Sequence, residues 1–344
     1  MSIQVGKYLP FFIDDILRWK DVEKLDDSVI RSNLLNLSNI YRGLLVFGLE
    51  NQNISLLSNV DAENQSLRYR ASVYHNFFKE IFCDASPKSK YTFGVYADDG
   101  DLPNVSFPIF SFQKEINGNN MLIPDIDFFL YNFYESVEFV DNRLFDDKAC
   151  KAIFVGSTTG APLQVVDGNP MRTITEKHLL SGEVQRVRSA LNFRGSSDVY
   201  FDLPVIVQFD NQATFEKLAA MGFGTNKKIA LQEQLANKFI ISMDGNGATC
   251  ARIVNSLKSN SVLMKYKSNS MLFYFSALHA WEHYIPIDND SDVVEYLTIE
   301  SKAPGYFSYI TQNANRFYND YLTKQHIYEY TRCALRLYES IVVK

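Results

Sequence analysis

The sequence predicts an α/β protein that folds into two domains. Its 344 residues exceed the usual size of a single domain. Short apolar runs that end in Asp, Pro or other polar residues alternate with stretches of helical spacing, which is typical of parallel βαβ units. With 46% hydrophobic and 22% charged residues, the composition is that of a folded globular protein. We therefore expect two α/β domains, each with its own core.

The first half of the chain begins with helical spacing and changes to strand-like runs. Residues 26–82 carry apolar side chains at helical intervals, so we expect mostly helix there. From Tyr91 onward, the runs YTFGVYA, FPIFSF and NNMLIPD predict strands that lead into loops. The polar interval 141–151 then predicts a domain boundary. We place an N-terminal domain at 1–147 and a C-terminal domain at 148–325.

The second half repeats the alternation of strands and helices. Its strand candidates are KAIFV, VYFDLPVIVQF, KFIISM, SVLMK and HYIPI. Residues 214–221 have helical spacing, and 304–343 predict two terminal helices. This half therefore predicts parallel βαβ units.

Charge and cysteine content exclude several classes of protein. The formal net charge of −6 argues against bulk nucleic acid as a partner, because phosphate binding needs clustered Lys and Arg. The four cysteines form no Cys-x-x-Cys pair, so neither a zinc site nor a disulfide framework is indicated. No signal peptide or uncharged membrane span is recognisable, so a reducing cytoplasm is expected. Attachment to a membrane surface stays open.

A glycine-rich turn follows one strand candidate. The run KFIISM ends in Asp244, Gly245, Asn246 and Gly247, and a helical pattern opens near Thr249. Backbone N–H groups and the positive end of the helix dipole would then point at one place, which is how proteins bind phosphate without a metal. Arg252 would add a charge-assisted contact. The alternative is an ordinary βα turn that binds nothing, because short glycine motifs are common.

A second turn of this kind follows KAIFV. It reads Gly156-Ser157-Thr158-Thr159-Gly160, and Arg172 follows in Asn-Pro-Met-Arg. Small residues leave backbone amides accessible, and an arginine that returns to the loop would complete an anion pocket. Neither turn is a Walker loop, since Gly-Lys-Ser/Thr is absent. Two such turns in one half of the chain favour a shared nucleotide diphosphate.

These residues carry a resemblance to a known family. The run DGNGATCARIVNSLKSNSVLMK and the later WEHYIP, with IFVGSTTG and NPMR before them, resemble glycosyltransferase family 90. The family includes bacterial lipopolysaccharide-modifying enzymes, fungal capsule xylosyltransferases and animal protein O-glucosyltransferases. The resemblance covers about 91–297. It implies a GT-B fold, with two Rossmann-like domains facing a central cleft, an inverting mechanism and a uridine diphosphate (UDP) sugar as donor.

The resemblance also implies which residues bind the donor. Val155 departs from the family, which usually has arginine there, and Arg252 aligns only with a one-residue insertion. In the fold that it implies, the final helix, 326–344, crosses back to the first domain. The implied donor-binding residues are Gly156, Ser157, Thr158, Thr159, Arg172, Asp244, Gly245, Asn246, Gly247, Ala248, Thr249, Arg252, Lys265, His283 and Tyr284.

An inverting transfer also needs a base for the acceptor hydroxyl. The cluster Asp98-Asp99-Gly100-Asp101 follows the strand YTFGVYA, where the family has its catalytic aspartate. Asp99 is favoured because Asp-Gly resembles the bacterial members, Asp101 resembles the animal members through Asp-x-Pro, and Asp98 stays open. Asp125 in LIPDIDFF is a further candidate, with the alternative that it caps a turn. His283 is expected to support the donor pocket.

We therefore expect an inverting, metal-independent transferase that moves a hexose or pentose from a UDP-sugar to a carbohydrate or lipid-linked oligosaccharide. No metal or cofactor is expected. The family's bacterial members suggest lipopolysaccharide, lipooligosaccharide or capsule synthesis at the inner membrane face. Two other readings stay open: an inactive sugar- or nucleotide-binding module, and a metal-dependent GT-A transferase that uses Asp99 and Asp101.

Overall fold

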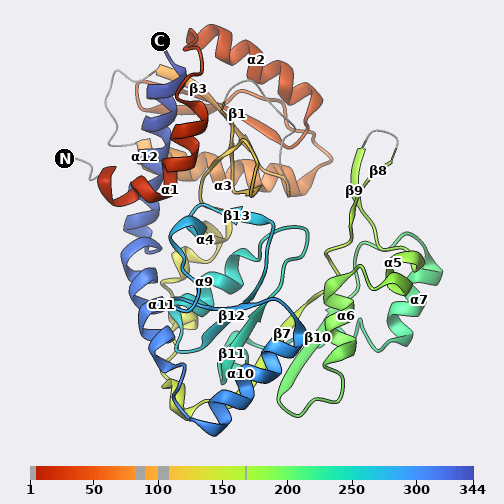
Figure 1. Ribbon diagram of the computed structural model, residues 1–344. Coiled ribbons are helices and arrows are strands. Elements are labelled where there is room, and N and C mark those ends of the chain that lie inside the picture. The colour runs from red at the N-terminus through yellow and green to blue at the C-terminus, as the bar shows by residue number, and fades with distance from the viewer. Residues whose placement is uncertain (1–4, 83–89, 100–107, 167–168) are drawn as a thin grey trace. The chain divides into compact units, whose positions relative to one another are not determined.

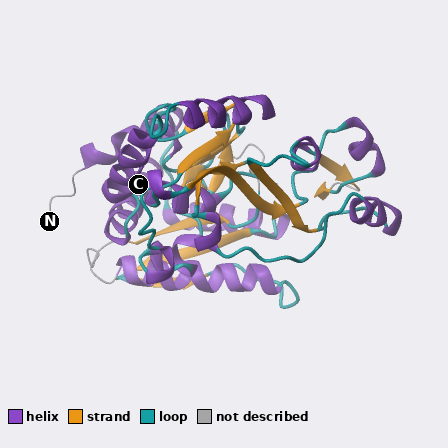
Figure 2. Ribbon diagram, turned by 90° about the horizontal axis from the view of Figure 1, so that it is seen from below, coloured by secondary structure: helices purple, strands orange, loops and turns teal. Residues whose placement is uncertain are grey.

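A computed structural model describes residues 5–82, 90–99, 108–166 and 169–344. The chain divides into two compact units. Unit 1 comprises Met1–Phe133, Asn269–Ala277 and Tyr321–Lys344, and unit 2 comprises Tyr134–Ser268 and Leu278–Asp320. Figure 1 labels the elements of both units, and Figure 2 distinguishes strands, in orange, from helices, in purple.

Unit 1 contains a mixed sheet of five strands in the order β2-β1-β3-β4-β6. β1 pairs antiparallel with both β2 and β3, whereas β3, β4 and β6 run parallel. Its sheet therefore differs from the parallel sheet expected of a Rossmann-like domain. The strands are β1 (Leu44–Glu50), β2 (Asn53–Leu56), β3 (Lys90–Tyr96), β4 (Phe110–Ser111) and β6 (Met121–Leu122), and a separate pair is formed by β5 (Gln113–Glu115) and β13 (Ser270–Leu272).

The helices of unit 1 bring together distant parts of the chain. The long C-terminal helix α12 is part of this unit, and its Tyr338 hydroxyl donates to the backbone oxygen of Thr92 in β3. An aromatic cluster that includes Phe47, Phe78 and Phe93 fills the core. The helices are α1 (Val5–Trp19), α2 (Asp27–Ile40), α3 (Gln65–Phe82), α4 (Asp127–Leu130) and α12 (Lys324–Val342).

The hairpin β1–β2 corrects the expectation of mostly helix across 26–82. Helices α2 and α3 occupy the two ends of that range, but residues 44–56 form strands. The turn between the strands has positive φ at both central residues, Asn51 (50°) and Gln52 (70°), as a tight two-residue hairpin requires. Because Gln rarely adopts this conformation, the residue types did not signal the turn.

Unit 2 is a doubly wound α/β unit with a five-stranded, entirely parallel sheet. The strand order is β10-β7-β11-β12-β14, so the strand that comes first in the chain lies second in the sheet. This unit confirms the predicted parallel sheet. Its strands are β7 (Ala149–Ser157), β10 (Val199–Val205), β11 (Asn237–Ser242), β12 (Val262–Tyr266) and β14 (Ile285–Ile287), with a hairpin of β8 (Leu163–Val166) and β9 (Asn169–Arg172).

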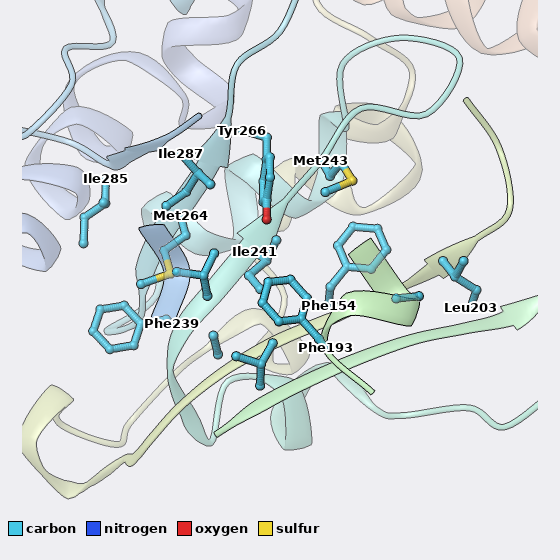
Figure 3. Close-up of a cluster of buried hydrophobic side chains, with 14 of the residues drawn as sticks. Phe154, Phe193, Leu203, Phe239, Ile241, Met243, Met264, Tyr266, Ile285 and Ile287 are labelled. Carbon is cyan, nitrogen blue, oxygen red and sulfur yellow. The ribbon is translucent and has the colours of Figure 1, made fainter. Parts of the chain in front are cut away.

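Apolar side chains on the strands of unit 2 pack against helices. Figure 3 shows the main cluster, in which Phe154, Phe239, Ile241 and Met264 lie together. Its further members include Val187 of α6 and residues of α10. The helices are α5 (Glu176–Ser181), α6 (Gln185–Asn192), α7 (Gln212–Ala220), α8 (Leu231–Gln234), α9 (Cys250–Lys258), α10 (Asp290–Lys302) and α11 (Ser308–Tyr321).

The strand order determines where a ligand would bind. After β7 the chain crosses to β10 on one side, and it then returns past β7 to β11 on the other side. In doubly wound sheets, ligands bind at such a switch point, outside the carboxyl ends of the two strands. The crevice between the ends of β7 and β11 is therefore the expected site in unit 2.

Candidate functional site

The two glycine-rich turns meet at this switch point. The first turn leaves β7 at Ser157 and the second follows β11, which ends at Ser242. A Cβ atom added to Gly245 would lie 2.5 Å from Oγ1 of Thr159, and one added to Gly160 would lie 3.4 Å from the backbone oxygen of Gly245. Gly160 also has a φ of +102°, which a side chain would strain. Glycines therefore permit the close approach of the two turns.

Arg186 of α6 hydrogen-bonds to both turns and so links them. Its Nε and Nη2 donate to the backbone oxygens of Asp244 (2.9 Å) and Met243 (2.8 Å) beside the second turn. Its Nη1 donates to Oγ1 of Thr159 (2.7 Å) and to the backbone oxygen of Ser157 (3.2 Å) in the first turn. The planar fork of a guanidinium suits such a set of acceptors. The sequence analysis missed this residue, because nothing in the local pattern distinguishes it from other helical arginines.

Arg252 lies in α9, which begins after the second turn. Its Nη2 donates to the backbone oxygen of Val155, and its guanidinium carbon lies 4.2 Å from the centroid of the Phe154 ring. The guanidinium of Arg186 lies 5.2 Å from the same centroid. Among the described residues, Nη1 of Arg252 is buried without any hydrogen-bond partner. A buried donor of this kind is costly unless a ligand or water accepts from it.

The electrostatics of the site favour an anion. Burial lowers the pKa of Arg186 to about 10 and that of Arg252 to about 9, the latter with a further contribution from Arg186. No carboxylate in the described part of the chain forms an ion pair with either guanidinium. Burial also lowers the pKa of Lys265, which Asp244 partly opposes. A bound anion would stabilise the charged form of all three cations.

Several predicted donor residues have structural contacts. The Thr158 side chain is fully buried, and its hydroxyl both donates to and accepts from the backbone of Val207, so it faces the protein interior. Nη1 of Arg172 donates to the backbone oxygen of Ala161, the residue that follows the first turn. The hydroxyls of Thr249 and Ser242 hydrogen-bond to each other at the start of α9.

The second turn is held by one hydrogen bond within its own backbone and by side chains from outside it. The amide of Gly245 donates to the backbone oxygen of Gly247 (3.1 Å), and Ala248 is buried directly after it. The Ser268 hydroxyl donates to the carboxylate of Asp244, whose pKa is raised by burial. Oδ1 of Asn246 is buried with no hydrogen-bond partner in the described chain. Asn246 therefore adds a second buried polar atom without a partner in the described chain, after Nη1 of Arg252. It lies on the same turn as Gly245, which closely approaches Thr159.

His283 and Tyr284 precede β14 and do not follow the carboxyl end of a strand. Nδ1 of His283 accepts the backbone N–H of His279 at 2.9 Å, and burial lowers the pKa of this histidine. Nζ of Lys265 lies 5.9 Å from the centroid of the Tyr284 ring. These contacts give His283 a role in holding the segment before β14.

A pocket of about 250 Å³ opens beside the carboxyl ends of β12 and β14. Gln185 and Arg188 line it from α6, one residue before and two residues after Arg186, and Asp288 and Asn289 line it from the segment just before α10. Its remaining wall is Asn192, Tyr266 and Asp290. Part of the pocket wall is therefore formed by α6, the helix whose Arg186 hydrogen-bonds to both turns.

The wall of this pocket is held by hydrogen bonds. The Asp290 carboxylate accepts from the hydroxyls of Ser189 (2.7 Å) and Tyr266 (2.6 Å) and from the Asn192 amide (2.7 Å). The carboxylate of Asp292 accepts the backbone N–H groups of Asp288 and Asn289, which caps α10. The polar lining is thus fixed in place before any ligand arrives.

In unit 1, Asp98 and Asp99 follow the carboxyl end of β3. Asp98 is half-buried, and burial raises the pKa of its carboxyl, an effect that Arg70 opposes and Asp99 adds to. Asp99 is exposed, with Oδ1 3.7 Å from Nη2 of Arg70. Asp101 lies outside the described residues. Oδ1 of Asp125 accepts the backbone N–H of Asp127 at 2.9 Å, so Asp125 stabilises the turn that leads into α4.

The remaining predictions concern cysteines and membranes. Cys150, Cys250 and Cys333 are free thiols, which are the cysteines that the structure describes. None of the helices in the described ranges combines the length and the apolar character that crossing a bilayer requires.

Comparison with known proteins agrees with the resemblance in the motifs. Residues 204–343 match the model of glycosyl transferase family 90. No curated protein matches the chain. The matched stretch contains the second turn and Arg252, whereas the first turn and the aspartates of unit 1 precede it. The match confirms the resemblance: the chain is a glycosyltransferase, with a family 90 region at residues 204–343.

Proposed function

We propose that this glycosyltransferase moves a hexose or pentose from a UDP-sugar to a carbohydrate acceptor, with inversion and without a metal ion. Unit 2 binds the donor, and unit 1 supplies the base, which is the division of labour of a GT-B enzyme. The single observation that carries the donor site is the meeting of two glycine turns at a strand switch point, beside the buried Arg186 and the buried Nη1 atom of Arg252.

The donor diphosphate lies against the two turns. The buried Nη1 of Arg252 supplies a charged donor that has no acceptor among the described residues. Arg186 holds the turns together from below, and its positive charge adds to the local potential. As the sugar leaves the diphosphate, negative charge grows on the leaving oxygen. Fixed cations and backbone dipoles stabilise that charge without reorganising.

The nucleoside lies in the pocket beside β12 and β14. The pocket shares α6 with the diphosphate site, since Gln185 and Arg188 flank Arg186 in the sequence. Asp288 is exposed at its rim, where a carboxylate accepts hydrogen bonds from ribose hydroxyls. The choice of uridine rests on the family resemblance.

The reaction is a displacement at the anomeric carbon. The acceptor oxygen forms the new bond to that carbon as the bond to the diphosphate oxygen breaks, and the acceptor proton passes to a carboxylate. We assign this base to Asp98 rather than Asp99, because the Asp98 carboxyl is half-buried against Gly43 and burial raises its pKa, whereas Asp99 is exposed and lies 3.7 Å from the guanidinium of Arg70.

The resemblance to bacterial members supports a lipid-linked or lipopolysaccharide-type acceptor at the cytoplasmic face of a membrane. Lipooligosaccharide and capsule precursors belong to the same chemical class. In each of them the acceptor is a sugar hydroxyl, so the chemistry proposed above is unchanged.

A donor panel tests the proposal. UDP- and GDP-sugars are screened in EDTA for hydrolysis and for thermal stabilisation, and UDP and pyrophosphate are titrated separately. We expect one UDP-sugar to be hydrolysed in EDTA. We also expect Arg188→Ala to weaken UDP binding by about fivefold, the loss of roughly one hydrogen bond, and to leave pyrophosphate binding unchanged. No response to any UDP-sugar, or a strict need for metal, would contradict the proposal.

A further inference from the structure

Unit 1 contains a second pocket, of about 280 Å³, that the transfer mechanism does not use. It lies between α3, the segment that includes α4 and residues 132–133, and the start of α12. All its lining residues belong to unit 1. It is therefore distinct from the pocket and the two turns of unit 2.

Aromatic rings form the floor of this pocket. Phe77 and Phe129 are stacked with their centroids 3.9 Å apart. Tyr328 approaches Phe77 at 5.4 Å and Phe133 at 5.6 Å. Phe129 and Tyr328 are partly exposed, so parts of these rings face the open pocket. Such faces bind the apolar C–H surface of a sugar ring, because the face of an aromatic ring is negative and sugar C–H groups are weakly positive.

Polar groups surround the aromatic floor. Asn76 and Glu80 are exposed on α3, and Lys324 is exposed at the start of α12. The Tyr328 hydroxyl donates to the Glu80 carboxylate, and Nζ of Lys324 lies 5.2 Å from the centroid of Phe133. Amide, carboxylate and ammonium groups together both donate to and accept from hydroxyls. Because one acid and one base offset each other, the rim suits a neutral ligand.

The pocket shares one face of α3 with Arg70, which forms an ion pair with Asp99, the neighbour of the proposed base Asp98. Arg70, Val73, Phe77 and Glu80 follow one another at spacings of three, four and three residues, so they form a single stripe along the helix. Arg70 contacts Asp99 at one end of the stripe, and the other three line the pocket. At 1.5 Å per residue, Arg70 and Glu80 are separated by roughly 15 Å along the helix axis. A linear oligosaccharide can extend over this distance.

We propose that this pocket is a carbohydrate subsite that binds a neutral sugar ring of the acceptor, remote from the ring that reacts. The inference rests on the proposed function, because the acceptor is taken to be a carbohydrate that reaches Asp98. Binding at a remote ring orients the acceptor chain, so it adds affinity and selectivity for acceptors of more than one sugar.

Titration of neutral oligosaccharides tests this subsite. The probes are gluco-, galacto- and manno-oligosaccharides of two to six units. Their binding to the full chain is measured by saturation-transfer NMR. Asn76→Ala and Lys324→Ala each remove one polar group from the rim. Lys79→Ala is the matched control, because Lys79 is exposed on α3 and does not line the pocket. We expect a longer oligosaccharide to bind and to lose about fivefold in affinity in both rim variants, but not in the control.

Three results would overturn the subsite: no oligosaccharide binds the parent protein, the rim variants bind as well as the control, or a fatty-acid probe occupies the pocket and sugars do not displace it. UDP is titrated into the same samples. If UDP fails to bind while an oligosaccharide binds at the rim, the proposed transfer function fails and the carbohydrate site stands. If UDP binds equally to all variants and oligosaccharides do not bind, only the subsite fails.

Discussion

The proposed base, Asp98, has a half-buried carboxylate that packs closely against the backbone. Its carboxylate lies so close to Gly43 that a Cβ atom at that glycine would overlap it. Burial and the neighbouring Asp99 raise the pKa of Asp98, and Arg70 opposes them. A base must be ionised to accept a proton, so activity should fall as the pH drops through this raised pKa.

Substitutions of Asp98 and Arg70 test which residue is the base, and each has a predicted direction of change in activity or in its pH dependence. Asp98→Asn should lower kcat/KM by about 10² to 10⁴-fold, as expected for loss of a general base. Arg70→Ala removes the cation that lowers the pKa of Asp98, so the acidic limb of the profile of kcat/KM against pH should move to higher pH. Asp99→Asn should retain most activity. Loss of transfer in Asp99→Asn, with Asp98→Asn active, would reassign the base.

The two adjacent aspartates, Asp98 and Asp99, show how much of a candidate site can be predicted from the sequence alone. The acidic cluster after β3 was predicted, because carboxylates at a strand end are visible in the residue pattern. Which carboxylate is buried depends on Gly43, from a distant part of the chain, and on Arg70 of α3. Neither contact leaves a local signal, so the sequence favoured Asp99 from resemblance alone.

At the scale of the elements, α6 organises the proposed donor site of unit 2. One of its side chains, Arg186, hydrogen-bonds to both turns, and two others, Gln185 and Arg188, line the neighbouring pocket. The turns were predictable because each combines an apolar strand, glycines and a polar exit. The helix that joins them was not, since its role depends on the crossover between β7 and β10.

Loss of the Arg186 side chain should destabilise unit 2. Arg186→Gln leaves the backbone oxygens of Met243, Asp244 and Ser157 without their donor, at a cost of roughly 3 kcal/mol. Arg186→Lys should rescue little, because an ammonium lacks the planar fork. Urea denaturation measures the change. Arg188→Gln, at an exposed position two residues away, should change stability by less than about 0.5 kcal/mol. Equal effects of the two Gln variants would refute the assignment.

The hairpin of unit 1 shows where element prediction failed. The apolar run of β1, LLVFGLE, lies within the range that the sequence predicts to be mostly helical. The turn after it, Asn51-Gln52, lacks the glycine that would indicate a hairpin. By contrast, the parallel strands of unit 2 are buried runs bounded by polar residues, and these were predicted correctly. Turn chemistry, rather than strand propensity, made the difference.

At the scale of the whole molecule, a buried ion pair ties the sheet of unit 2 to its C-terminal segment. Nζ of Lys238 lies 2.6 Å from Oε1 of Glu300, and both side chains are buried. The Glu300 carboxylate also accepts the backbone N–H groups of Gly305 and Phe307. The pair therefore links β11, α10 and the start of α11.

Breaking this pair should cost far more than breaking an exposed pair. Glu300→Gln leaves the buried ammonium of Lys238 with the exposed carboxylate of Asp146, 3.9 Å away, in place of its buried partner, and should destabilise the protein by about 3 kcal/mol. The control is Glu50→Gln, which removes the partner of Lys90 at 2.9 Å where both side chains are 62% exposed, and it should not shift the unfolding midpoint. Similar unfolding midpoints for the two variants would show that burial does not make the Lys238–Glu300 pair more stabilising than an exposed pair.

The central claim is that the two turns of unit 2 hold the diphosphate of a uridine nucleotide. Calorimetric titration of UDP in EDTA tests it most directly, with the parent protein, Gly245→Ala and the control Gly6→Ala, whose added Cβ meets nothing within 4 Å. The account predicts binding to the parent and to Gly6→Ala, and at least a tenfold loss in Gly245→Ala, about 1.4 kcal/mol. No binding to the parent, or equal affinity in Gly245→Ala, would contradict it.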